Sequence, residues 1–274
     1  MNSLNKVRIE IGKIKIADLR RFVKAEIQPR LSQEWVCLQG TSFVRFGGYS
    51  IQKLIFSEFY RQPQYRIYYS VQSLAIPVIH EDDIGIGATL RERSAKNFLG
   101  LFQKQPREVW FNWNTRLEDV NYIMELIAEQ VEPPINLPLT ANRVFDYLNK
   151  HHLKKENKNP IILWTAGILL GELEKYDEAR QFLFDAVGLY TDGQKEIKAL
   201  VETNKVSEEK YLRWVMQLEQ VQEALKALGD ADTFRKYCKK VASESIEILK
   251  IPDYQAHRKP HRSRRRQPRH PDRL

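Results

Sequence analysis

Residues 42–76 read SFVRFGGYSIQKLIFSEFYRQPQYRIYYSVQSLAI, and this stretch decides the fold of the chain. It is rich in Phe, Tyr, Ile and Val, which favour strands. Gly47-Gly48 and the segment 61–64 interrupt it, and short interruptions of this kind are typical of turns. Between residues 65 and 71, large apolar residues alternate with polar ones, as in a half-buried strand. Strands joined by such short connections form hairpins, so we predict an antiparallel sheet.

The segments around this stretch complete an α+β domain, which we predict over residues 1–153. Apolar residues alternate with charged or polar ones in two further segments, so strands are predicted at 7–11 and 107–113. Apolar residues recur at steps of three and four in other segments, so helices are predicted at 18–29, 115–132 and 140–150. This order indicates an antiparallel sheet of about four to five strands with flanking helices, and not a wound parallel sheet.

The chain beyond this domain is predicted to be helical. The charged segment 154–159 is the best candidate for a linker. Asn159-Pro160 is typical of a helix start, Ser207 is predicted to cap a long helix, and Gly229 is predicted to end it. We therefore predict an all-α segment of helical hairpins over residues 159–251.

The last 23 residues, 252–274, are predicted to form a disordered basic tail, because they contain almost no apolar residue with which to fold. From His257 to Leu274 there are eight Lys and Arg residues and one Asp, a net charge of +7 out of +9 for the whole chain. The basicity therefore belongs to the tail and not to the folded parts. If the tail binds phosphates or an acidic surface, its clustered cations would do so: Arg258, Lys259, Arg262, Arg264, Arg265, Arg266 and Arg269.

The composition indicates a cytoplasmic protein that does not enter a membrane. Cys37 and Cys238 make no disulfide framework in a chain of 274 residues, and we expect both thiols to be reduced. Residues 1–21 contain no continuous apolar region of the kind that signal peptides carry. The longest apolar run, Ile161 to Gly171, is far shorter than the ~20 residues that a membrane span needs.

No segment carries a recognisable catalytic motif, and we predict no catalytic residue, no metal site and no cofactor. His80-Glu81-Asp82-Asp83 has the composition of a metal site, but adjacent side chains do not converge on one ion, so a solvated acidic loop is favoured. Gly85-Ile86-Gly87 lacks the third glycine of a phosphate loop and is interpreted as a turn or strand start. His151-His152 is interpreted as the cationic end of a helix.

Aromatic residues and arginines interleave at 59–61 and 65–69. A sheet face that exposes such residues can stack single-stranded bases. The nearly neutral body of the chain offers no supporting basic field. We therefore favour a face that packs under helices, with the arginines reaching solvent from the opposite face.

The first part of the chain resembles an uncharacterised family of bacterial α+β domains. The resemblance covers roughly residues 16–150. It rests on an opening helix, an antiparallel meander, a strand with consecutive large aromatics (Val109-Trp110-Phe111) and a helix that ends before prolines. It implies the fold and no catalytic residues. The connection between Pro77 and Pro106 is longer here than in that family.

A second resemblance lies in the helical segment. Small and large residues alternate there in the pattern of a single divergent tetratricopeptide-type hairpin, which usually binds peptides or packs on a neighbouring domain. Glu174 stands where that pattern usually has a turn glycine. The residues that carry the pattern are Leu163, Ala166, Gly167, Leu170, Tyr176, Ala179, Leu183 and Ala186.

These observations favour a non-catalytic protein-interaction module. One alternative is a nucleic-acid-associated protein that uses the basic tail. The other is an enzyme of the α+β domain, because two acids that are distant in sequence can meet in space. A concave pocket with convergent polar side chains would favour the enzyme, and a filled core would disfavour it.

Overall fold

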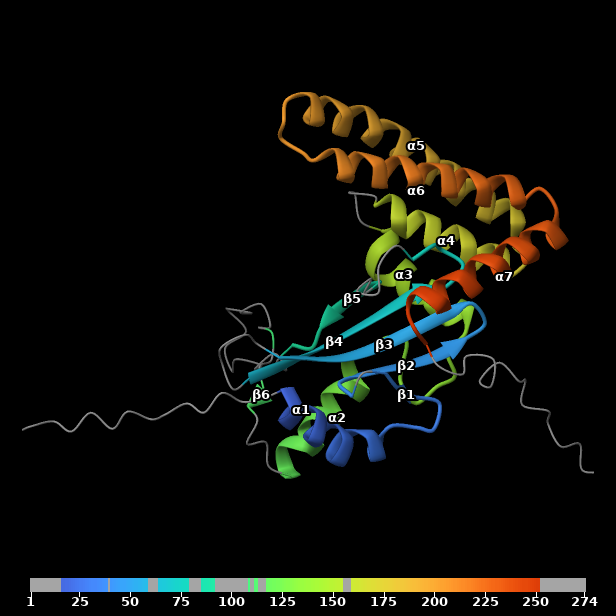
Figure 1. The fold of residues 1–274 in the computed structure, drawn as a ribbon. Coiled ribbons are helices and arrows are strands. Elements are labelled where there is room, and N and C mark those ends of the chain that lie inside the picture. The colour runs from blue at the N-terminus through green and yellow to red at the C-terminus, as the bar shows by residue number, and fades with distance from the viewer. Residues whose placement is uncertain are drawn as a thin grey trace, which may run out of the picture.

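A computed structural model of the chain describes residues 16–38, 40–58, 64–78, 85–91, 108, 111–112, 117–154 and 159–251. Figure 1 shows a sheet with helices packed around it and a long helical hairpin at the top of the view. The α-helices are α1 (Ile16–Phe22), α2 (Leu117–Gln130), α3 (Ala141–Leu148), α4 (Pro160–Glu172), α5 (Tyr176–Glu202), α6 (Glu208–Ala227) and α7 (Ala231–Ile248). A π-helical turn and a 3₁₀ turn continue α1 to Arg30, and another π-helical turn continues α3 to Leu153.

The predicted antiparallel sheet is confirmed. Its strands follow the order β1-β2-β3-β4-β5, every pairing is antiparallel, and β6 pairs with the start of β4. The strands are β1 (Val36–Cys37), β2 (Ser42–Gly47), β3 (Ser50–Glu58), β4 (Gln64–Ser73), β5 (Ile86–Thr89) and β6 (Phe111–Asn112). The predicted strand at 7–11 lies outside the described residues. The sequence prediction had no separate strand for β1, and it identified β5 only as a possible strand start at Gly85-Ile86-Gly87.

One face of the sheet packs against the helices that flank it in sequence. Phe43, Leu54 and Ile67 are fully buried on this face, in one cluster with Leu19 of α1 and residues of α2. Neighbouring strand residues point to opposite faces, so Tyr65, Ile67, Tyr69 and Val71 share this face as predicted. The aromatic segment 65–69 is therefore largely packed, and segment 59–61 lies outside the described residues.

The opposite face of the sheet is covered by α7, the last described helix. Val44, Ile51 and Leu74 form a buried cluster there with Ala242 of α7 and with Leu249 just beyond it. Ser245 Oγ of α7 donates a hydrogen bond of 3.2 Å to the carbonyl oxygen of Ile76. The last described helix thus completes a core that the first strands begin.

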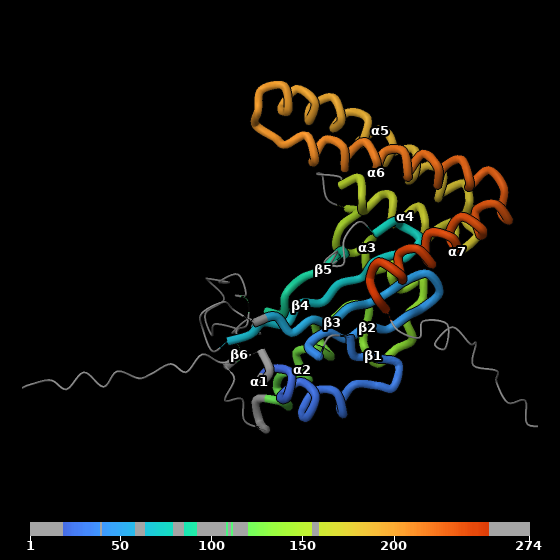
Figure 2. The backbone as a smooth tube through the Cα atoms, viewed as in Figure 1, coloured from blue at the N-terminus to red at the C-terminus, as the bar shows by residue number. Residues whose placement is uncertain are grey.

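The predicted helical hairpins are observed (Figure 2). Asn159 caps α4 by accepting a hydrogen bond from the Ile161 N–H, and Asp230 caps α7 in the same way through Thr233. Ser207 stands at the N-cap position of α6 as predicted, but its side chain makes no capping hydrogen bond. Glu174, in the turn between α4 and α5, has a φ of 63°, in the left-handed region that favours glycine.

The α4–α5 interface uses the small residues noted in the sequence. Ala166, Ala179 and Ala186 are fully buried, and an ideal Cβ built on Gly167 would lie 2.7 Å from Leu183 side-chain atoms. Small side chains at these positions let the two helices approach closely. This geometry supports the physical reading of the pattern, while the family resemblance itself stays a prediction.

Side chains from both sides of the predicted domain boundary pack together. Leu148 of α3 and Leu169 of α4 belong to one buried cluster that also contains Val71 of β4. Residues 155–158 of the expected linker lie outside the described residues. The division into residues 1–153, 159–251 and 252–274 stays a prediction, and the described residues of the first two parts share this core.

The β2–β3 turn leaves no room for a side chain at Gly47. An ideal Cβ there would lie 1.9 Å from the carbonyl oxygen of Leu139, where the connection from α2 to α3 passes the turn. We expect Gly47→Ala to lower the free energy of unfolding by about 3 kcal/mol, because backbone must move to admit the methyl group. Urea unfolding monitored by circular dichroism measures this change.

Gly188→Ala is the matched control, because an ideal Cβ at this position in α5 has no atom within 4 Å apart from the neighbouring residues and backbone of its own helix. It should raise the free energy of unfolding by about 0.5–1 kcal/mol, since alanine favours a helix interior over glycine. Equal effects of the two substitutions would contradict the close approach at Gly47.

Candidate functional site

The α5–α6 hairpin extends well beyond the helix that supports it. With a rise of 1.5 Å per residue, the 27 residues of α5 span about 40 Å and the 13 residues of α4 about 20 Å. The two helices run antiparallel, and Trp164 near the start of α4 meets Tyr190 in the middle of α5, with ring centroids 6.3 Å apart. Figure 1 shows α5 and α6 continuing together past the end of α4.

Trp214 holds α6 to α5 where the hairpin leaves α4. Its indole N–H donates a hydrogen bond of 2.7 Å to the carbonyl oxygen of Tyr190, and the two rings lie 5.1 Å apart. An ideal Cβ on Gly193 would lie 2.5 Å from the indole, so the ring packs directly on the α5 backbone. The base of the extension is therefore rigidly packed, and this fixes the direction in which α6 points.

The face of α6 that points away from α5 exposes two large apolar side chains. Leu212 is 57% exposed and Met216 is 37% exposed, and their spacing of four residues places them side by side on the helix. Exposed glutamates lie around the pair on the same helix: Glu208, Glu209, Glu219 and Glu223. We call the apolar pair and these four glutamates the α6 outer face. One of the four, Glu209, pairs with the exposed Arg213 at 3.3 Å. Its apolar centre and acidic rim are the candidate functional site.

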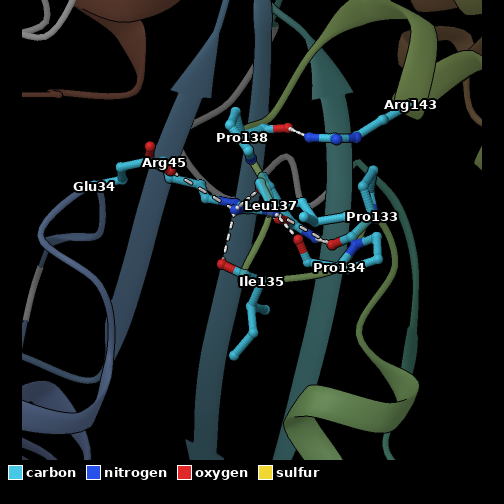
Figure 3. A network of polar contacts seen from close by, with 9 residues as sticks. Glu34, Arg45, Pro133, Pro134, Ile135, Leu137, Pro138 and Arg143 are labelled. Carbon is cyan, nitrogen blue, oxygen red and sulfur yellow. Dashed lines mark hydrogen bonds and ion pairs between the residues drawn. The ribbon is translucent and has the colours of Figure 1, made fainter.

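Arg45 of β2 is the largest buried charge in the described chain, but its hydrogen-bonding capacity is fully used. Its side chain is completely buried and stacks on Trp35, with the guanidinium carbon 5.2 Å from the ring centroid. All five N–H donors have acceptors within the protein, so none is left for a ligand. Figure 3 shows the network, whose acceptors are Gln52 Oε1 and the carbonyl oxygens of Pro133, Pro134, Ile135 and Leu137.

Burial lowers the pKa of Arg45 to about 10, and the nearby Glu34 carboxylate partly opposes that effect. The guanidinium therefore stays charged at neutral pH. Its role is structural, because it fastens the connection between α2 and α3 to the sheet.

His151 and Lys150 meet a carboxylate that sequence reasoning did not connect with them. His151 Nε2 and Lys150 Nζ each lie 2.7 Å from an oxygen of Glu132, two residues beyond the end of α2. Burial alone would raise the pKa of Glu132, but the hydrogen bonds from Lys150 and His151 outweigh it and hold the pKa below its ordinary value. The predicted cationic helix end is thus engaged in a cross-link between α2 and the end of α3.

The remaining sequence candidates form no site among the described residues. Cys37 and Cys238 are free thiols, and burial raises the pKa of Cys238 to about 12, so it stays protonated and unreactive. His80 to Asp83 and the tail cations from Arg258 to Arg269 lie outside the described residues, and their roles stay predictions. Among the described residues, no group of three metal-ligating side chains converges, and no helix is long and apolar enough to cross a membrane.

The Arg45 network predicts that lysine cannot replace this arginine. Arg45→Lys should lower the free energy of unfolding by about 3 kcal/mol, because a single ammonium cannot satisfy carbonyls that bind both edges of a guanidinium. Arg180→Lys on α5, where the arginine is exposed, should change it by less than about 0.5 kcal/mol. Urea unfolding of both variants is the measurement, and equal stabilities would contradict the network's importance.

The Glu132 cluster predicts a pH-dependent contribution to stability. A carboxylate with a lowered pKa in the folded state stabilises the protein above its ordinary pKa of 4.5, and this contribution is lost as pH falls further. Glu132→Gln should therefore destabilise the protein above pH 4.5, and the difference from wild type should shrink below that pH. Glu219→Gln, with an exposed carboxylate, should follow the wild-type pH dependence in the same urea titrations.

No protein-family model matches the sequence, and neither a characterised protein nor a solved structure was found to be similar to it. The two resemblances drawn from sequence patterns therefore stay predictions. What the chain binds is argued from its own surface.

Proposed function

We propose that the chain is a non-catalytic interaction module that binds a partner protein on the α6 outer face. The observation that carries this proposal is the exposure of Leu212 and Met216 on a helix that extends beyond its support. Burying a leucine or methionine side chain contributes roughly 1.5–3 kcal/mol. Two such side chains held on a rigid helix supply the apolar centre of an interface without the cost of ordering a loop.

The rim of the site defines the chemistry of the partner. Glu208, Glu209, Glu219 and Glu223 surround the apolar pair, so a partner with lysines and arginines around an apolar stripe fits best. Methionine adapts to differently shaped apolar surfaces, which suits a helix that receives another helix. We infer that the partner presents a basic amphipathic helix.

We also infer a cytoplasmic location. Both cysteines are free thiols, as expected in a reducing compartment.

A double substitution tests the site. Leu212→Arg with Met216→Arg removes the apolar centre and adds like charges that repel a basic partner. We expect partners that co-purify with the full-length wild-type chain to be reduced by at least about tenfold. A photo-crosslinking residue at position 212 should then form covalent adducts with those same partners, which identifies direct contact.

Phe184→Arg provides the matched control, because Phe184 is even more exposed, at 64%, but lies on α5. It should leave partner binding unchanged. Circular dichroism and the melting temperature should show that all variants are folded. If the α6 variant keeps the wild-type partners, or if only the α5 variant loses them, the α6 outer face is not the binding site.

A further inference from the structure

Helix α5 carries the most exposed large apolar side chain among the described residues, on the side of the helix that faces away from α4. Phe184 is 64% exposed. Gly188 lies one helical turn further along, so the two positions share one face of α5. Ala186 and Tyr190 are buried on the opposite side, in the cluster that α5 shares with α4. Figure 1 shows α5 along the top of the view.

Gly188 has no structural explanation among the described residues. A glycine in the interior of a helix destabilises it, because glycine loses more conformational freedom on folding than any other residue. The other glycine of α5, Gly193, makes room for the Trp214 indole of α6. Apart from its own helix, no described residue lies within 4 Å of an ideal Cβ on Gly188. Bare backbone therefore lies beside Phe184, where a side chain of another molecule can pack.

Phe184 and Gly188 belong to one straight stripe on the outer side of α5. Its positions are separated by alternating steps of four and three residues, the spacing of a helix face that packs along another helix. Five of the six residues are exposed and the threonine is partly buried. We call them the α5 outer stripe: Asp177, Gln181, Phe184, Gly188, Thr191 and Lys195.

Two exposed ion pairs lie at the two ends of the stripe. Asp177 pairs with Arg180 at 3.7 Å, and Asp192 pairs with Lys195 at 3.3 Å. All four side chains are at least 55% exposed, so both pairings are weak and leave the charges available to a second partner. The order along the helix is acid, base, acid, base. The same sequence in the reverse direction therefore presents the opposite charge at each of the four positions.

We propose that two copies of the chain form a symmetric dimer in which their α5 outer stripes pack antiparallel. A two-fold axis midway between Phe184 and Gly188 places the aromatic ring of each copy on the bare backbone of the other. Pairing of one surface with itself around a two-fold axis is the commonest arrangement of soluble oligomers. The α6 outer face is not part of this contact, and the dimer does not depend on the partner proposed for that face.

The same register matches the charges at both ends of the contact. Asp177 lies opposite Lys195 of the second copy, and Arg180 lies opposite Asp192 of the second copy. Symmetry repeats both pairs, so the dimer gains four charge pairs and brings no like charges together among these residues. Such complementarity fixes the register of an interface and disfavours other registers.

Sedimentation velocity of the full chain measures the dimer. The contact runs from residue 177 to residue 195, a length of about 27 Å, on a single helix of each copy. An interface of this size is small, so we expect a Kd on the order of 10 µM at physiological salt. The chain should therefore change from monomer to dimer between about 1 and 100 µM.

Charge reversal tests the register. Arg180→Asp and Asp192→Arg each place like charges opposite one another at two symmetry-related points, and each should weaken the dimer by at least about tenfold. An equimolar mixture of the two variants restores opposite charges at both points, so it should form a heterodimer with a Kd near that of the wild type. A folding defect would not be repaired by mixing. Lys239→Asp, which reverses an exposed charge on α7, should leave the Kd unchanged.

Two substitutions test the centre of the contact. Phe184→Ala should weaken the dimer by at least about tenfold, because it removes the central apolar side chain. Gly188→Ala should weaken it by about fivefold, because the methyl group occupies the place of the partner ring. The same substitution should stabilise the monomer against urea at about 1 µM, which separates dimerisation from folding. A chain that stays monomeric up to about 100 µM, a dimer that keeps its Kd in Phe184→Ala, or reversed variants that stay monomeric on mixing would overturn the proposal.

Discussion

The buried guanidinium of Arg45 is the constraint on which much of the architecture depends. A charge without solvent contact is tolerated only when every donor has an acceptor, and here four acceptors are backbone carbonyls of one short connection. That connection leads from α2, which covers one part of the sheet, to α3, which packs on Val71 further along the strands. Because Arg45 fixes its path, it also fixes where the helical part of the chain begins.

Successive packing contacts fix the positions of α4, α5 and α6 relative to α3. Leu148 of α3 packs with Leu169 of α4. The small residues Ala166 and Gly167 of α4 allow α5 to approach closely. Trp214 of α6 donates a hydrogen bond to α5. The chain then returns to the sheet through α7, so both ends of the helical segment are attached. Only the outer half of the α5–α6 hairpin lies beyond these attachments. That geometry leaves the α6 outer face accessible on a packed helix.

The strands and helices could be predicted from the periodicity of apolar residues in the sequence, and the buried hydrogen-bond network of Arg45 could not. The alternation in residues 65–71 predicted the strand and its faces, and the short connections before it predicted its antiparallel pairing. Asn159-Pro160 and Ser207 predicted the starts of α4 and α6. Arg45 occupies an inward strand position beside Phe43, and Gln52 lies directly opposite it. Polar residues on an apolar face indicate a buried polar network. The sequence does not reveal its acceptors, because they are backbone carbonyls about ninety residues away.

The candidate site was predictable only in outline. The sequence indicated helical hairpins but not that α5 would extend far past α4, because helix length alone does not reveal what covers a helix. The carboxylate that holds His151 also depends on long-range packing.

The cover of the second sheet face by α7 has a consequence for synthesis. Val44, Ile51 and Leu74 enter the ribosomal exit tunnel early, but Ala242 and Leu249, which shield them, are made almost two hundred residues later. The strands can pair as they emerge, yet their aliphatic side chains stay in water until α7 has also been made. A nascent chain therefore exposes one apolar sheet face while the segment between β4 and α7 is synthesised, and we expect chaperones at the ribosome to bind it.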